Sequence, residues 1–292
     1  MKRSTFLAFI DFSKAYDGIR RDKLWYKLEQ MGLHADGKFL CALKSLYENV
    51  KCSVRLQGHF SGWFDVNIGL KQGCLLSCSL FNLYINDLAT RLTSLQKGVW
   101  VQSELVSLLM YADDLVLIAE NADDLQCMLD ELDLWCKDWD VKINEQKSQI
   151  MHCRNKGITV TNRTFTCGDK CMKICSKYKY LCLMLDEHLD YDVTAKHVAQ
   201  SAHRALGLFI AKDKSQGGFT FEIFTKLYDT MVSSIIEYGS AIWGHSSISC
   251  IDDVQHRACR YFLGLSKRAP NRAVQEDMGW QLQWERQMLC VV

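Results

Sequence analysis

The sequence contains a single proline, Pro270, and no long apolar run. No Pro/Gly/Ser-rich tract marks a linker, so domain boundaries have to be inferred from changes of pattern. No apolar stretch reaches the roughly 20 residues of a transmembrane helix, and Asp11 interrupts the apolar residues 6–10 too early for a secretory leader. We therefore expect an intracellular protein, in the nucleus or the cytoplasm, with no membrane partner.

The chain also lacks an excess of either charge, because 35 Lys and Arg residues stand against 34 Asp and Glu residues. Bulk charge therefore predicts neither nucleic-acid binding nor its absence. The fourteen cysteines are irregularly spaced, which is typical of reduced thiols, and we expect no disulfide partner. Cys167, Cys171 and Cys175 lack the paired short spacing of zinc sites, so strand cysteines are the favoured interpretation.

Hydrophobic periodicity divides the chain near residue 190 and predicts an α+β fold. Up to that point strands are mixed with helices, and from residue 194 the pattern is helical. The expected strands lie at 6–12, 52–56, 62–66, within 142–151, and within 159–185. The expected helices lie at 20–31, 37–48, 75–92, 123–139, 195–212, 221–238 and 251–263.

Two adjacent aspartates, Asp113 and Asp114, lie in the middle of the apolar segment 108–119. Burying even one uncompensated charge costs several kcal/mol, so something has to compensate both carboxylates. This segment alone leaves two explanations open. A tight turn could lift both side chains into solvent, or a divalent cation could neutralise them.

Asp11, at the end of the first expected strand, favours the cation. Packing that strand beside the hairpin of Asp113 and Asp114 would bring three carboxylates together, and such a cluster repels itself unless it holds cations. Two Mg²⁺ ions about 3.5–4 Å apart, or Mn²⁺ in their place, would support in-line phosphoryl transfer. That chemistry is used by polymerases.

Several short sequence blocks occur in a fixed order along the chain. They are FIDFSKAYD at 9–17, GLKQGCLLS at 69–77, LFNLYIND at 80–87, YADD at 111–114, NEQK at 144–147, KYL at 179–181 and IEYG at 236–239. In this order they resemble motifs A to E, and the segment that follows them, of reverse transcriptases of LINE-type non-LTR retrotransposons. YADD alone is a weak signal, but the order and spacing of all the blocks are specific.

The resemblance implies a polymerase palm, an antiparallel sheet with packed helices, at residues 1–190, and a helical thumb-like region at residues 191–292. It implies an RNA-directed DNA polymerase that transfers a nucleotide from a dNTP to a primer 3′-OH. An RNA template and a DNA primer would be its partners. Asp11, Asp113 and Asp114 would be the catalytic metal ligands, and Lys147 would act on the pyrophosphate.

Further roles follow from the same resemblance. The nucleotide would contact the backbone carbonyl of Phe12, the aromatic gate Tyr16 that excludes a 2′-OH, and the pair Gln72 and Gly73. Tyr180 and Leu181 would form the primer grip. Without the resemblance, an ordinary role stays open for each of these residues. Tyr16 could pack in the core, Gln72 and Gly73 could belong to a plain loop, and Tyr180 and Leu181 could be buried strand residues.

The sequence departs from the family pattern at three places. Leu75 stands where the family usually has proline, and Cys182 where it usually has glycine. The chain also begins almost at the first motif, so we expect the N-terminal fingers to be missing. An alternative therefore stays open, namely a catalytically inactive remnant of a truncated retroelement that at most binds nucleic acid.

Overall fold

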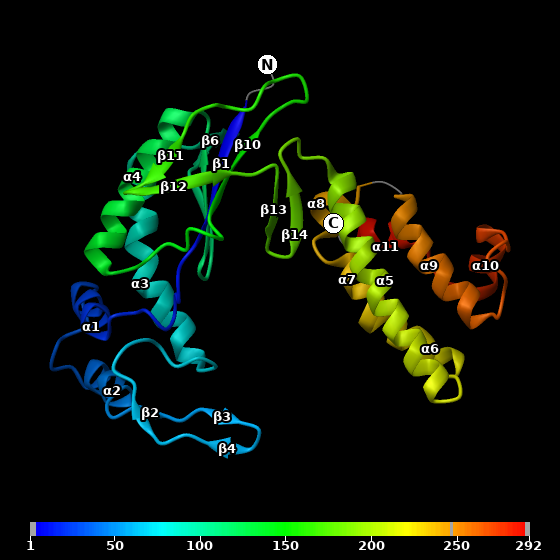
Figure 1. The fold of residues 1–292 in the computed structure, drawn as a ribbon, viewed down its shortest axis with the longest axis horizontal. Coiled ribbons are helices and arrows are strands. Elements are labelled where there is room, and N and C mark those ends of the chain that lie inside the picture. Colours follow the sequence, from blue (N-terminus) through cyan, green and yellow to red (C-terminus); the bar gives the residue numbers. More distant parts are fainter. Residues whose placement is uncertain (1–3, 246–247, 290–292) are drawn as a thin grey trace. The chain divides into compact units, whose positions relative to one another are not determined.

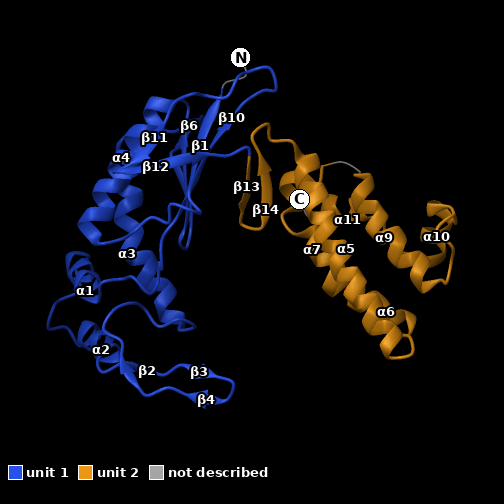
Figure 2. Cartoon of the chain, in the orientation of Figure 1, with its two compact units in different colours: residues 1–176 blue, residues 177–292 orange. Residues whose placement is uncertain are grey.

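The computed structural model describes residues 4–245 and 248–289 of the chain. The chain forms two compact units, residues 1–176 and residues 177–292, which Figure 2 colours separately. Each unit has a hydrophobic core of its own, and each is described by itself.

The first unit is built on a six-stranded sheet with strand β1 (Thr5–Asp11) in its interior (Figure 1). β1 is antiparallel to both neighbours, β9 (Asp114–Ala119) and β10 (Gln149–Cys153). Beyond β9 lies β8, and beyond β10 lie β12, which runs parallel to β10, and then β11. The bounds of these outer strands are Leu108–Tyr111 for β8, Lys170–Ile174 for β12 and Phe165–Cys167 for β11.

Side-chain alternation along β1 separates a core face of the sheet from the face that carries the candidate site. Phe6 and Ile10 share one face and join the core that includes helices α3 (Leu75–Ser94) and α4 (Ala122–Trp139). Because successive side chains of a strand point to opposite faces, Asp11 points away from these helices. The core packing of β1 thus fixes the direction of its terminal carboxylate.

The strands predicted at 52–56 and 62–66 differ from those in the structure. The structure has two short ladders in this region, β2 with β5 and β3 with β4, and a turn at Gln57 and Gly58, both with positive φ, folds the chain back on itself between β3 and β4. A further hairpin, β6 with β7, was not predicted. The bounds are α1 Arg21–Gln30, α2 Lys38–Leu46, β2 Lys51–Cys52, β3 Arg55–Leu56, β4 His59–Phe60, β5 Phe64–Asp65, β6 Val99–Val101 and β7 Glu104–Val106.

Lys27 of α1 is buried where α1, α3 and α4 meet. Its ammonium group lies 2.5 Å from Asp87 Oδ1 and 3.7 Å from the ring centroid of Trp139. The rings of Tyr84 and Trp135 are close as well, at 4.6 and 5.0 Å. Burial lowers the pKa of Lys27 to about 8, although Asp87 partly offsets that effect.

The second unit consists of one hairpin, β13 with β14, and a group of helices. It begins before residue 190 because β14 packs on α5; the functional division expected at residue 190 stays a prediction. The helix predicted at 221–238 is present as α6, η1 and α7 in direct succession. The helices α8, α10 and α11 lie in the region predicted to be helical, but no bounds were predicted for them. The bounds are β13 Lys177–Tyr180, β14 Leu183–Asp186, α5 Tyr191–Ser215, α6 Phe221–Tyr228, η1 Asp229–Ser233, α7 Ser234–Glu237, α8 Ser240–Trp243, α9 Ser249–Phe262, α10 Asn271–Met278 and α11 Gln283–Leu289.

The predicted α+β class, with a sheet and packed helices followed by a mostly helical region, is confirmed. Within residues 4–245 and 248–289, none of the helices combines the length and the apolar character that crossing a membrane requires.

Candidate active site

Asp11 and Asp114 lie directly opposite each other at the ends of β1 and β9. The N–H of Asp11 donates to Ser148 Oγ at 3.0 Å, and the carbonyl of Asp11 accepts from the N–H of Asn144 at 2.8 Å. Because these backbone groups are turned toward Asn144 and Ser148, Asp11 and Asp114 form a non-hydrogen-bonded pair, the kind that brings side chains closest. Like charges in such a pair destabilise a sheet. The chain therefore holds two carboxylates together where folding alone disfavours them.

Asp113 occupies the tip of the hairpin that joins β8 to β9. Tyr111 pairs with Asp114, so Ala112 and Asp113 form a two-residue turn. Ala112 has a φ of +53°, a left-handed conformation that costs a non-glycine residue roughly 1–2 kcal/mol. Asp113 and Asp114 are partly buried, so the turn does not lift both carboxylates fully into solvent.

The charges around this hairpin are unbalanced. The pKa of Asp114 is raised, first by burial and then by the negative charges of Asp113 and Asp11, while Lys147 lowers it. Lys147 Nζ lies 3.5 Å from Asp11 Oδ1, and the Lys147 side chain is 68% exposed. Among the charges that act on Asp114, the solvated ammonium group of Lys147 thus opposes the carboxylates of Asp113 and Asp11.

The donor atoms at this end of the sheet are oxygens, which Mg²⁺ and Mn²⁺ prefer. Phe12 adds a backbone carbonyl. The bridge between Phe12 and Ile143 is formed by hydrogen bonds of Asp11 and Ser13, which flank Phe12 in the chain. The carbonyl of Phe12 itself therefore points to the opposite side, toward β9. In the part of the chain that the structure describes, no three His, Cys, Asp or Glu side chains are grouped so that they could hold a metal ion. Mg²⁺ is usually bound by one or two carboxylates together with substrate phosphates, so the donor set fits an open Mg²⁺ site.

A cavity of about 340 Å³ brings three of the predicted nucleotide-binding residues together, namely Tyr16, Gln72 and Gly73. The ring of Tyr16 stacks on Phe81 with 4.6 Å between centroids, so Tyr16 packs on the core and lines the cavity at once. The pKa of Tyr16 is raised by burial, by its contact with Cys78, and least by the negative charge of Asp113. That last influence links the cavity to the hairpin tip.

The loop before α3 is tied to the turn that follows β1. The side-chain amide of Gln72 donates to Asp17 Oδ1 at 3.0 Å, and the N–H of Leu70 donates to the carbonyl of Tyr16 at 2.8 Å. Gly69 has a φ of +83° and would place a Cβ 2.8 Å from the carbonyl oxygen of Asp17, so a side chain there would clash. The glycine-containing loop is therefore fitted closely against the residues of the first motif.

The two predicted primer-grip residues belong to the second unit. Tyr180 ends β13, and Leu181 and Cys182 form the turn that leads to β14. Both turn residues are left-handed, with φ of +42° for Leu181 and +67° for Cys182. Their proposed role in gripping a primer stays a prediction.

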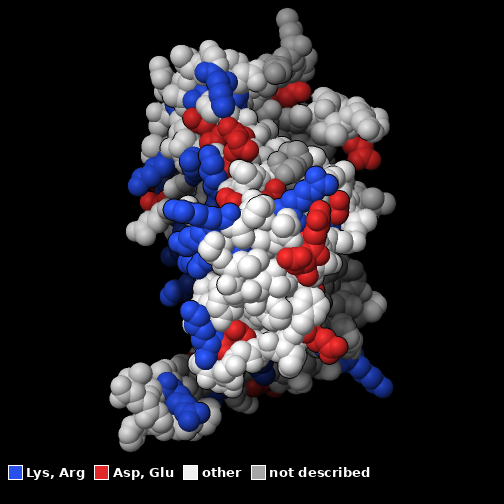
Figure 3. Space-filling model, turned by 90° about the vertical axis from the view of Figure 1, so that its right-hand side faces the viewer, with Lys and Arg blue, Asp and Glu red and all other residues white. Residues whose placement is uncertain are grey.

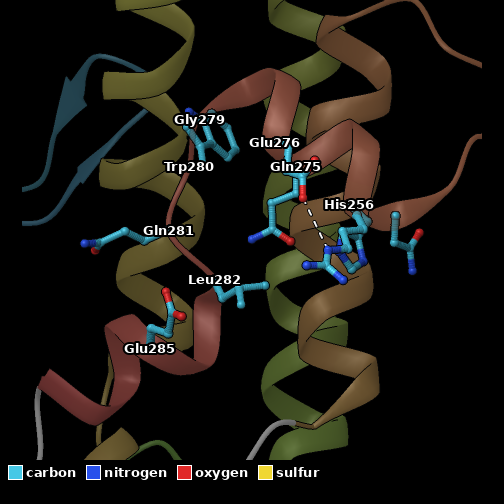
Figure 4. A pocket seen from close by; sticks show the side chains of 10 residues that line it. His256, Gln275, Glu276, Gly279, Trp280, Gln281, Leu282 and Glu285 are labelled. Atoms are coloured by element: carbon cyan, nitrogen blue, oxygen red, sulfur yellow. Dashed lines mark hydrogen bonds and ion pairs between the residues drawn. The ribbon is translucent and has the colours of Figure 1, made fainter.

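A larger cavity, of about 670 Å³, lies in the second unit between α9, α10 and the start of α11 (Figure 4). His256 on its wall is 7% exposed, and among the described residues its Nδ1 has no hydrogen-bond partner. Arg272 and Glu276 form an ion pair at 3.2 Å beside it. None of the predicted catalytic or nucleotide-binding residues lines this cavity.

Charge on the surface agrees with the near-neutral composition. On the face drawn in Figure 3, most Lys and Arg side chains lie along the left edge, whereas Asp and Glu side chains lie mainly at the upper centre and on the right. Neither sign covers the whole of that face.

Sequence reasoning missed the residues that hold the site in place. Ser148 and Asn144 fix the backbone of Asp11, Cys78 contacts the hydroxyl of Tyr16, and Asp17 binds Gln72. The one available signal was proximity in sequence, because each of these residues lies within or directly beside a motif block.

A family model described as reverse transcriptase (RNA-dependent DNA polymerase) matches residues 1–217. The chain is 22% identical, over 285 residues, to the RNA-directed DNA polymerase from mobile element jockey of Drosophila melanogaster; the match covers 93% of this chain and 30% of that protein. It is 26% identical, over 265 residues, to the probable RNA-directed DNA polymerase from transposon BS of the same species, covering 86% of this chain and 28% of that protein. The chain thus spans less than a third of the length of these curated relatives.

A third relative is more similar over a shorter stretch. It is the retrovirus-related Pol polyprotein from type-2 retrotransposable element R2DM of Drosophila melanogaster, 35% identical over 129 residues, with 44% of this chain and 12% of that protein covered. Among solved structures, apo telomerase from Candida tropicalis aligns with a TM-score of 0.48 and 12% identity. That alignment covers 100% of this chain and 50% of the telomerase.

Proposed function

The chain belongs to the reverse transcriptase (RNA-dependent DNA polymerase) family, and we propose that it acts as an RNA-directed DNA polymerase. It adds the nucleotide of a dNTP to the 3′-hydroxyl of a DNA primer on an RNA template. The observation that carries the proposal is the facing pair of Asp11 and Asp114, with Asp113 at the adjoining hairpin tip. Relatives named RNA-directed DNA polymerases support the same activity.

Asp11, Asp113 and Asp114, together with the carbonyl of Phe12, are the residues that would hold two Mg²⁺ ions, with Mn²⁺ as a substitute. When bound, the ions lower the pKa of the attacking hydroxyl and neutralise charge on the phosphates. The carboxylates are partly buried at the end of a rigid sheet, so little reorganisation is required when the substrates arrive.

The 340 Å³ cavity is the proposed site for the incoming dNTP. The Tyr16 ring stacks on Phe81 and lines this cavity, which supports a role as the wall that excludes a ribose 2′-OH. The amide of Gln72 and the open backbone at Gly73 provide hydrogen-bonding groups without a bulky side chain between them. Selection of a dNTP over an rNTP would therefore depend on the shape of this wall.

Lys147 is the proposed proton donor to the leaving pyrophosphate. Its contact with Asp11 at 3.5 Å keeps the ammonium group at the site, and its exposure leaves the side chain free to move to a phosphate. Tyr180 and Leu181 are proposed to bind the primer strand near its 3′ end.

Primer extension tests the proposal. The purified chain is incubated with poly(rA)/oligo(dT), dTTP and Mg²⁺, beside an Asp113→Ala variant and an Asp36→Ala control, which removes an exposed loop carboxylate. We expect extension by the unmodified chain and by Asp36→Ala, and none by Asp113→Ala. Equal extension by all three proteins, or by none of them, would contradict the proposal.

A further inference from the structure

The turn between β13 and β14 places two bulky residues in a conformation that glycine usually adopts. Leu181 and Cys182 both have positive φ, the pattern of a two-residue hairpin turn that favours Asn-Gly. Both residues have a Cβ atom, which comes too close to the backbone in this left-handed conformation. Contacts from outside the hairpin therefore help to stabilise the turn, in addition to the pairing of β13 with β14.

Those contacts come from residues 238 and 239, which join α7 to α8. The hydroxyl of Tyr238 donates a hydrogen bond to the carbonyl of Leu181 at 3.1 Å. Gly239, with a φ of +63°, lies so close to the hairpin that an added Cβ would sit 2.8 Å from Leu183 Cδ1. The indole N–H of Trp243 in turn donates to the carbonyl of Tyr238 at 3.3 Å.

Open space lies beside the turn. A cavity of about 350 Å³ lies against the turn, and Cys182, Leu183, His197 and Tyr238 are among the residues that line it. Cys182 itself is exposed, whereas Leu183 is buried. The tip of the turn thus rests beside open space, and the hydrogen bond from Tyr238 holds its backbone on that side.

We propose that Tyr238 and Gly239 position the Leu181–Cys182 turn for binding of the primer strand. Tyr238 is a positioning residue, because it acts on the backbone carbonyl of Leu181. Gly239 suits this place because its φ of +63° is left-handed, a conformation that glycine adopts without steric cost. This inference rests on the proposed function, in which Tyr180 and Leu181 form the primer grip.

The first test separates primer binding from chemistry. We expect Tyr238→Phe to raise the KM for poly(rA)/oligo(dT) by about 3- to 10-fold, the effect of losing one hydrogen bond, with kcat changed less than about twofold. Tyr191→Phe serves as the control, since Tyr191 is also partly exposed and on the same unit. An unchanged KM in Tyr238→Phe, or an equal rise in Tyr191→Phe, would overturn the proposal.

The second test is a rescue. Glycine at position 182 adopts a left-handed conformation without steric cost, so a turn containing it needs less support. We expect Tyr238→Phe combined with Cys182→Gly to return the KM to within about twofold of the original value. A double variant that keeps the high KM would contradict a positioning role for Tyr238.

A measurement without catalysis keeps this inference distinct from the proposed function. Hydrogen exchange of the full chain, followed by mass spectrometry of the peptide that contains residues 180–184, reports on the turn directly. We expect exchange to become at least about threefold faster in Tyr238→Phe and to stay unchanged in Tyr191→Phe. Equal exchange in all proteins would overturn the positioning role, whether or not the chain extends a primer.

Discussion

Asp11 and Asp114 face each other across two neighbouring antiparallel strands, in the register that brings their side chains closest. Two carboxylates in such a pair repel each other, and Lys147 is the cation near them. The arrangement reduces the stability of the sheet and creates a place where a divalent cation would be favoured. The first two predictions follow from this balance.

Replacing Asp114 with Asn should stabilise the fold at neutral pH while removing polymerase activity. The pKa of Asp114 is higher in the folded protein than in the unfolded chain. At a pH above the folded-state pKa the ionised carboxylate therefore lowers the free energy of unfolding, whereas at a pH below the unfolded-state pKa it has no such effect. We expect urea unfolding at pH 7 to show a gain of about 0.5–1 kcal/mol, the size of a cross-strand pair. The gain should disappear on acidification, and a variant that is less stable than the original at pH 7 would contradict this account.

Removing the charge of Lys147 should affect both the rate and its pH dependence. Lys147→Met removes the group that lowers the pKa of Asp114, so the acid limb of the pH–rate profile should move to higher pH. Loss of a proton donor should also reduce kcat by about 100-fold. Lys147→Arg, which keeps the charge, should restore the acid limb but not the full rate; a shifted profile with unchanged kcat would exclude the proton-donor role.

Tyr16 should control the choice between deoxyribonucleotides and ribonucleotides. Tyr16→Val removes the wall that the ring provides beside Phe81, so incorporation of rNTP relative to dNTP should rise by at least about tenfold. Tyr16→Phe keeps the ring and should keep the selectivity. Relative kcat/KM values for dTTP and UTP on poly(rA)/oligo(dT) provide the measurement, and equal selectivity in all three proteins would refute the gate.

Lys27 should make the stability of the first unit depend on pH in the alkaline range. Its folded-state pKa of about 8 lies below the ordinary 10.5, so the unfolded chain binds more protons between these values and stability rises with pH. We expect a rise of about 1–3 kcal/mol between pH 8 and pH 10.5. In Lys27→Met this rise in stability should be absent, while Asp87 still accepts a hydrogen bond from the Trp135 indole. The measurement is urea unfolding of both proteins across this pH range, and parallel curves of stability against pH would contradict the assignment.

Part of the sheet could be predicted from sequence because its central strands are apolar runs that end at aspartates, as at residues 6–12 and in the hairpin of Asp113 and Asp114. The helix predicted at 123–139 was found from the helical spacing of its apolar residues and is present as α4. The β6–β7 hairpin was missed because each of its strands has only three residues, too few for a periodic signal. The helices α10 and α11 lie in the region predicted to be helical, but with eight and seven residues they span only about two turns, too few for the periodicity to define their bounds.

The family could be predicted from ordered motifs, and the prediction of a reverse transcriptase domain of the LINE-type non-LTR class is confirmed. The contacts that hold the site were beyond sequence reasoning. Ser148 lies 137 positions from Asp11, and Tyr238 lies 57 positions from Leu181. Such contacts depend on the register of strands and on helix packing, neither of which a motif specifies.

Binding of Mn²⁺ tests most directly whether Asp11, Asp113 and Asp114 form a divalent-cation site. Free Mn²⁺ is measured by electron paramagnetic resonance during titration of the original chain, Asp11→Asn, Asp113→Asn and the surface control Asp36→Asn. We expect the first two variants to bind Mn²⁺ at least about tenfold more weakly than the original chain, and Asp36→Asn to bind it equally well. Equal affinity in all four proteins would contradict the account.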